Sequence, residues 1–195
     1  MEYTLRQEEI ITAALHLLAS GGLRSLTMKR IADAVGVTEP AVYRHFRSKS
    51  EIIKALLSRF DLAVEFGNGA GFEPVAEFIR ARVKQVMAEP DLARVLFAEE
   101  FFMESEDYSR ELVGMMHRHK EGVLEHLRAG QKAGLIRSDI GLDELFRIIM
   151  GPVRLLIKQW GLSGGGFDLE SKSEDLLAAL KILLINYEAQ YYRDR

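Results

Sequence analysis

The sequence predicts an all-α protein of about nine helices, in which a three-helix module precedes a larger helical bundle. Apolar residues recur at intervals of three and four along almost the whole chain, which is the spacing of one helix face. No segment alternates between apolar and polar residues with the period of two that a half-buried strand requires. Glycines, and capping residues such as Thr and Ser, separate the apolar stretches, so the helices have identifiable ends.

The composition is that of a chain that folds around a core: of 195 residues, 48% are hydrophobic, 28% are charged and four are prolines. The absence of cysteine excludes disulfides and thiolate zinc sites, and is compatible with a reducing compartment. The N-terminus lacks a basic start followed by an apolar signal region, and no apolar run approaches the roughly 20 residues that span a bilayer. We therefore expect a cytoplasmic protein that is not a membrane protein.

Charge is distributed unevenly, although the net charge is only −3. Residues 1–50 hold seven Lys and Arg against five Asp and Glu, whereas residues 51–195 hold 19 against 24. The short N-terminal part is thus basic and the rest is acidic. An asymmetry of this size is weak evidence for a nucleic-acid partner and is also common in enzymes.

Three helices are expected in the first 50 residues. The first carries an apolar stripe and stops at Gly21 and Gly22. The second starts at Thr27, whose hydroxyl can accept from a first-turn amide, and ends at Gly36. The third starts at Thr38, with a proline in its first turn. Their predicted core residues are Ile10, Ile11, Ala14, Leu15, Leu18, Ile31, Ala32, Val35, Val42 and Phe46.

Two short helices that meet across a turn containing Gly36 are typical of a helix-turn-helix, in which the second short helix enters the DNA major groove. Residues 26–49, LTMKRIADAVGVTEPAVYRHFRSK, resemble the signature of the TetR family, a "T…IA…GV…..YRHF.SK" pattern. The resemblance implies a DNA-binding head on a helical body that dimerises, and hence a transcriptional repressor with a double-stranded operator as its partner.

The resemblance also implies which residues contact DNA. Phosphates would be held by Thr27, Tyr43, His45 and Lys49, with further contributions from Lys29 and Arg30. The residues facing the groove would be Thr38, Glu39, Ala41 and Arg44, and Arg44 is the best candidate for a bidentate contact to guanine. Other interpretations remain open: His45 as a half-buried packing residue, Tyr43 as a core aromatic, and Glu39 as a residue that serves the helix dipole or cytosine rather than phosphate.

The rest of the chain is predicted to be helical. A fourth helix is capped by Ser48 and is followed by a glycine-rich link at residues 67–71. Further apolar periodic stretches cover residues 74–88, 90–103, 107–133, 142–160 and, after the glycines at 164–166, 170–191. We expect residues 1–50 to form the DNA-binding domain and residues 51–195 to form a domain for ligand sensing and dimerisation.

The last two helices are apolar on more than one face, so each needs more than one partner. A second copy of the chain is the expected cover, and the resemblance implies a dimer interface of four helices. The predicted interface residues are Leu156, Trp160, Leu176, Leu180 and Leu184. Pro152 should bend the penultimate helix or interrupt its hydrogen bonds.

A cavity for a small-molecule effector is expected among the middle helices, although methionine and phenylalanine at helical spacing are more often plain core. Its candidate lining is Phe97, Phe101, Phe102, Met103, Met115, Met116, Met150 and Trp160. Residues 130–139, GQKAGLIRSD, resemble a turn found in family members and indicate no ligand. The histidines at 117, 119 and 126 do not share one face, so no metal or other cofactor is expected.

Three functions are to be compared with these features of the sequence. The first is a repressor that a small-molecule effector releases from a near-palindromic operator. The second is a DNA-binding protein of the same fold without such an effector, regulated by a protein or organising the chromosome. The third, an enzyme, is disfavoured because the sequence has no nucleophile and base signature, no phosphate-binding glycine motif followed by Lys, and no metal-ligand cluster.

Overall fold

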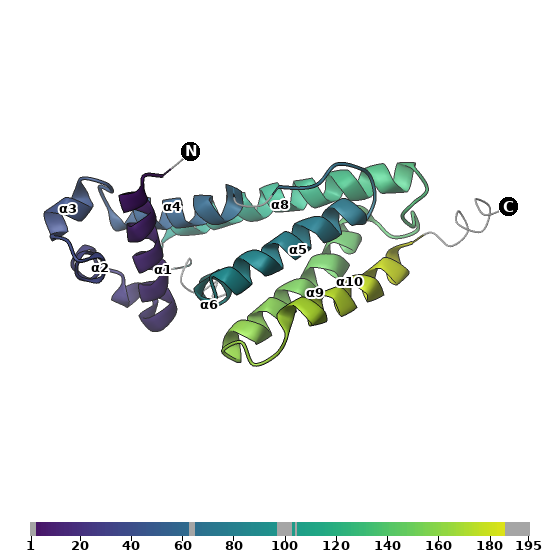
Figure 1. The fold of residues 1–195 in the computed structure, drawn as a ribbon. Helices are drawn as coiled ribbons and strands as arrows, with labels where there is room; N and C mark the ends of the chain where they lie inside the picture. The colour runs from purple at the N-terminus through teal and green to yellow at the C-terminus, as the bar shows by residue number, and fades with distance from the viewer. Residues whose placement is uncertain (1–2, 63–64, 97–102, 104, 186–195) are drawn as a thin grey trace. The chain divides into compact units, whose positions relative to one another are not determined.

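The computed structural model describes residues 3–62, 65–96, 103 and 105–185, and within them the chain forms nine helices and no strand beyond one isolated bridge (Figure 1). The predicted all-α fold is confirmed. The chain divides into two compact units: residues 1–63 with 91–115, and residues 64–90 with 116–195. None of the described helices is both long enough and apolar enough to cross a membrane.

Helix α1 (Leu5–Ser25) begins one residue after Thr4, in a reciprocal cap. The Gln7 amide donates to Thr4 Oγ1 at 3.3 Å, and the Thr4 amide donates to Gln7 Oε1 at 3.0 Å. The stop expected at Gly21 and Gly22 is a break rather than an end: Gly22 takes φ 66°, and one further helical turn follows. The predicted apolar stripe of this helix is buried.

The two short helices are α2 (Met28–Val35) and α3 (Glu39–Tyr43). Thr27 Oγ1 accepts from the Arg30 amide at 3.2 Å, so this predicted cap is confirmed. Gly36 ends α2 in the left-handed region, at φ 74°, where a residue with a Cβ would be strained. Thr38 occupies the N-cap position of α3, where its carbonyl oxygen accepts from the Ala41 and Val42 amides. Its hydroxyl makes no capping hydrogen bond.

The first unit is completed by α4 (Lys49–Leu62), α6 (Asp91–Val95) and the start of α8 (Glu106–Lys132). Both α4 and α6 pack on α1. The packing therefore groups α4 with the head, whereas the expected division placed residues 51–195 in the body. That division concerns function and stays a prediction.

The second unit contains α5 (Glu73–Ala88), the end of α8, α9 (Leu142–Leu162) and α10 (Leu169–Leu184). Helix α10 packs on α9 and on α5. It starts at the cap Asp168, whose carboxylate accepts from the Ser171 amide at 2.9 Å. Helix α9 continues through Pro152, which lies on an exposed side of the helix. Proline has no amide hydrogen, so the helical hydrogen bond to the Ile148 carbonyl is missing at this residue, while the expected bend stays a prediction.

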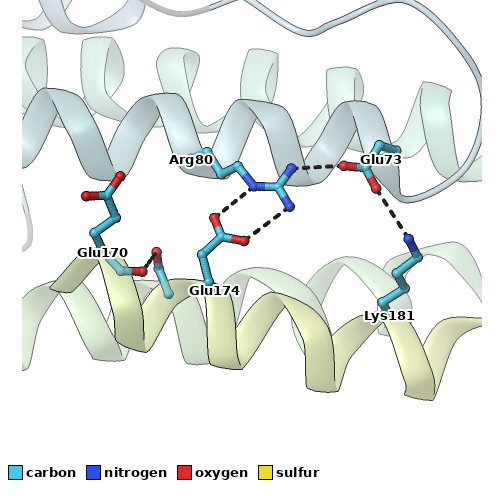
Figure 2. Close-up of polar contacts among 6 residues, drawn as sticks. Glu73, Arg80, Glu170, Glu174 and Lys181 are labelled. Carbon is cyan, nitrogen blue, oxygen red and sulfur yellow. Dashed lines mark hydrogen bonds and ion pairs between the residues drawn. The ribbon is translucent and has the colours of Figure 1, made fainter. Parts of the chain in front are cut away.

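An ionic clasp of four side chains joins α5 to α10 (Figure 2). The Arg80 guanidinium donates to both carboxylate oxygens of Glu174, at 2.8 and 3.3 Å, and to Glu73 at 2.9 Å. Lys181 Nζ lies 3.6 Å from the second oxygen of Glu73. The hydrogen bond from Arg80 lowers the pKa of Glu73, and the bonds to the two carboxylates raise that of Arg80. The clasp helps to fix which side of α10 faces α5.

The segment that resembles a family turn has a structural role. Gln131 Nε2 donates to the carbonyl oxygens of Arg137 and Ile140, at 2.9 and 3.0 Å, and so closes the turn after α8. The Arg137 amide donates to the Leu184 carbonyl at 3.0 Å, which holds the end of α10. This turn therefore joins the end of α8 to the end of α10.

Replacing Gly130 by alanine should destabilise the second unit by about 1 to 3 kcal/mol. A Cβ at this position would lie 2.5 Å from Gly71 Cα, and a backbone atom cannot move out of the way as easily as the end of a side chain. Chemical denaturation followed by circular dichroism measures the loss. Gly151→Ala is the matched control within the chain, since a Cβ at that position meets no atom of its own chain within 4 Å; because Gly151 is exposed on α9, both variants are compared with wild type at one protein concentration. Equal stability of the two variants would contradict the close approach.

Candidate nucleic-acid interface

The residues predicted to contact DNA are carried by a small, well-defined core. Ile31 and Ala32 of α2, Val42 of α3 and Phe46, shortly after α3, are all buried, so the two short helices are fixed against each other. The core was predicted from the apolar spacing, and the structure confirms it for these four residues. Side chains on the outer faces of α2 and α3 are consequently held in place by packing rather than by loops.

All the predicted DNA-contacting residues reach the surface of the first unit. Exposed residues are Thr27, Lys29, Arg30, Thr38, Tyr43 and Arg44, and half-buried ones are Glu39, Ala41, His45 and Lys49. The alternative that Tyr43 is a core aromatic is wrong, because 47% of its surface is exposed. Whether each of these side chains binds DNA stays a prediction.

The hydroxyl of Thr27 serves two purposes without conflict. Its oxygen accepts the Arg30 amide and so starts α2, while its own proton is not used in that bond. A phosphate oxygen could accept that proton. A residue that shapes the helix can thus also contact the DNA backbone.

The cations of this surface have no carboxylate partner among the residues that the structure describes. In the described part of the chain, none of six basic residues of the head takes part in an ion pair: Arg24, Lys29, Arg30, Arg44, Arg47 and Lys49. Other cations of the same unit are paired, Arg6 with Glu9, Lys54 with Glu111 and Arg59 with Glu8. The head therefore keeps its positive charge available for an external anion, which a phosphate backbone supplies.

The residues suggested for a sensor cavity are distributed over both units and over a segment outside the described residues. Phe97, Phe101 and Phe102 lie outside the described residues. Met103 and Met115 belong to the first unit, and Met116, Met150 and Trp160 to the second. The Trp160 indole packs against the turn after α9, since a Cβ added to Gly165 would lie 3.6 Å from it. The cavity lining stays a prediction.

The second unit contains a buried polar group that the sequence analysis did not single out. Arg82 on α5 is 6% exposed; its guanidinium donates to Gln85 Oε1 at 2.9 Å and lies 2.9 Å from His119 Nε2 on α8. The same guanidinium stands 5.0 Å from the centre of the Phe78 ring. Its position within the apolar stripe of α5, four residues after Phe78, was the available signal.

The histidines of α8 serve separate contacts. His119 meets Arg82 and the edge of Phe78, while His126 Nδ1 lies 2.8 Å from the Gly69 carbonyl oxygen. His117 is exposed. Among the described residues, no group of three or more His, Asp or Glu side chains could hold a metal ion.

The predicted dimer residues are covered to different degrees within their own chain. Leu180 and Leu184 are buried because α10 uses this side to pack on α9 and α5, and Trp160 on α9 is buried as well. These three residues have little surface to offer a partner, and their interface role stays a prediction. Leu156 and Leu176 are half-buried and stay predictions.

A different apolar surface of α9 and α10 is exposed, and we call it the outer face. On α9, Ile148, Leu155 and Leu162 repeat every seven residues and therefore lie on one side of the helix. On α10, Ile182 and Leu183 are more than half exposed. Four smaller exposed residues complete the outer face: Gly151, Pro152, Ala178 and Ala179.

Known proteins resemble this chain both locally and along its length. The family model described as "Bacterial regulatory proteins, tetR family" matches residues 10–56, which include α2 and α3. The repressor KstR2 of Rhodococcus jostii, an HTH-type transcriptional repressor, is 29% identical over 187 residues, which cover 89% of this chain and 88% of the relative.

Two solved structures share the fold. The fatty acid degradation regulator FadR of Bacillus halodurans has a TM-score of 0.76 at 18% identity, over 93% of this chain and 97% of that one. The regulator FadR of Bacillus subtilis, in complex with stearoyl-CoA, has a TM-score of 0.73 at 19% identity, over 89% and 96%. The arrangement of helices is thus common to all three chains.

Proposed function

The chain belongs to the TetR family of DNA-binding transcriptional regulators, and from this we propose that it is a homodimeric repressor that a small-molecule effector releases from a near-palindromic operator. The proposal places the protein in the cytoplasm, bound to chromosomal DNA, and assigns it no catalytic step. The observation that carries it is the surface formed by α2, α3 and the start of α4, where Lys29, Arg30, Arg44 and Lys49 have no carboxylate partner among the described residues.

The surface supplies both kinds of contact that sequence-specific binding needs. Phosphates would be held by Thr27, Tyr43, His45 and Lys49, which fix the position of the head without reading sequence. Arg44 directly follows α3, and its guanidinium can donate two hydrogen bonds to guanine O6 and N7. Glu39, in the first turn of α3, compensates the positive end of the helix dipole.

The outer face of α9 and α10 is the proposed dimer interface. Exposed large apolar side chains on two adjacent helices are unfavourable in water. In a two-fold dimer, α9 and α10 of one copy would pack on α9 and α10 of the other, and this contact would bury the outer faces of both. A dimer presents two heads to DNA, and a near-palindromic site with half-sites about 34 to 36 Å apart follows from that symmetry.

The second unit is the proposed effector-binding part. Its buried Arg82 and half-buried His119 place polar groups between α5 and α8, beside the Phe78 ring, and a few polar groups in an apolar setting are typical of ligand sites. A screen for effectors can begin with acyl-CoA thioesters, since the similarly folded FadR of Bacillus subtilis was solved with stearoyl-CoA. A DNA complex insensitive to every compound class would favour the alternative without an effector.

Lys49→Ala and Tyr43→Ala should weaken binding to all DNA sequences by similar factors, because phosphate contacts are independent of sequence. Lys49→Ala should also lower the slope of log affinity against log salt by about one per head. Arg44→Ala should instead relax the preference at one base position per half-site, at a cost of about 1 to 3 kcal/mol. Operator selection from random duplexes, followed by fluorescence anisotropy at several salt concentrations, measures all three effects.

Lys172→Ala is a suitable control, since it removes one exposed lysine from α10 in the second unit. It should leave affinity and salt slope unchanged. Wild-type protein that selects no sequence from the random pool would overturn the proposed function. A uniform loss across sequences in Arg44→Ala would reassign that residue to the phosphate set.

A further inference from the structure

The turn between α3 and α4 carries one cation, Arg47, to which the resemblance to the TetR signature assigns no DNA contact. Arg47 is exposed and stands between His45 and Lys49, two proposed phosphate contacts. In the described part of the chain its guanidinium is in no ion pair. Elsewhere in the same unit, Arg6 on α1 is paired with Glu9 and Arg59 on α4 is paired with Glu8.

The nearest acidic residue is engaged with the backbone of Arg47 rather than with its charge. Glu51 Oε2 accepts from the Arg47 amide at 2.6 Å, and the Glu51 amide donates to Ser48 Oγ at 3.2 Å. The two bonds close the turn reciprocally, as in a capping box. They hold the backbone of Arg47 in place while leaving its guanidinium to solvent, so less conformational entropy is lost when the side chain meets an anion.

The place of the turn favours the DNA backbone over the bases. In a helix-turn-helix, the N-terminal residues of the second short helix contact base edges. Arg47 comes four residues after the last residue of α3, beyond the end of that helix. It therefore follows the part of the chain that enters the groove and precedes Lys49 at the start of α4, where phosphates are proposed to bind.

We propose that Arg47 is an additional phosphate-binding residue, which clamps the DNA backbone beside each half-site and is positioned by Glu51. The inference rests on the proposed DNA-binding function and adds one contact per head to it. Its guanidinium can donate two parallel hydrogen bonds to a phosphate, a geometry that lysine cannot reproduce.

The test uses the full-length chain and a 30-base-pair duplex of arbitrary sequence, because phosphate contacts do not depend on sequence. Arg47→Gln should lower the slope of log affinity against log salt by about one per head and weaken binding several-fold, with an unchanged unfolding temperature. Arg47→Lys should keep the slope, since it keeps the charge, and should recover only part of the affinity. Arg6→Gln removes an equal charge from the same unit, where it is already paired with Glu9, and should change neither quantity.

The outcomes separate the two proposals. A wild-type slope in Arg47→Gln, while Lys49→Gln still lowers it, would overturn the role of Arg47 and leave the DNA-binding function standing. Wild-type protein with no salt-dependent affinity for the duplex would instead overturn the proposed function. A reduced slope in Arg6→Gln would also overturn the inference, because any lost charge would then produce the effect.

Discussion

Replacing Leu155 on α9 by glutamate is expected to separate the dimer into folded monomers. Leu155 is 57% exposed in the single chain, so the substitution places no charge in that chain's own core. In the proposed dimer it lies on the outer face, and two-fold symmetry would bury two unpaired carboxylates in one contact. At about 3 to 5 kcal/mol for a buried unpaired charge, dimer affinity should fall by at least two orders of magnitude.

Sedimentation at micromolar concentration measures this change against the monomer mass of 22.1 kDa. Operator affinity should fall with it, because a single head makes half of the contacts. Met87→Glu is the matched control: this residue is also apolar and exposed but lies on α5, so its variant should remain dimeric. A Leu155→Glu variant that sediments like wild type would place the interface elsewhere.

Replacing Leu180 on α10 by glutamate is expected to unfold the second unit rather than to separate subunits. Leu180 is 2% exposed, in the layer that packs α10 on α9 and α5. The variant loses the transfer free energy of a leucine and buries a carboxylate, which together cost several kcal/mol. That is a large part of the 5 to 15 kcal/mol that typically stabilises a domain.

The comparison with Ile182→Glu makes the test sharp, because the same substitution falls two residues away on the 59% exposed side of α10. Circular dichroism should show lost helix or a strongly lowered unfolding temperature for Leu180→Glu. Ile182→Glu should keep wild-type helicity and sediment as a monomer. If instead Leu180→Glu were folded and monomeric, Leu180 would be an interface residue after all.

The head could be predicted from sequence because its determinants are local. Thr27 caps α2 and Gly36 ends it within a few residues of the atoms they contact, and the spacing of Ile31, Val42 and Phe46 assigns them to one core. The same locality predicted most of the helix positions within the described residues. The predicted helix starts were less accurate where a capping residue outside the apolar stripe sets the first residue of the helix, as Thr4 does for α1 and Asp168 does for α10.

The sequence by itself determined the helices, the helix-turn-helix and the residue types that would contact DNA, since these depend on neighbours three or four positions away. Only the tertiary structure decided which side of α10 is covered. Helix α10 has apolar residues on more than one side, and periodicity cannot tell whether Leu180 or Ile182 faces the core; packing on α5 and α9 buries the first and exposes the second. The burial of Arg82 and the engagement of Glu51 with the Arg47 backbone likewise depend on three-dimensional contacts. Those contacts decide which charges stay available to a partner, because a charge already bound within the protein gains little from an external one.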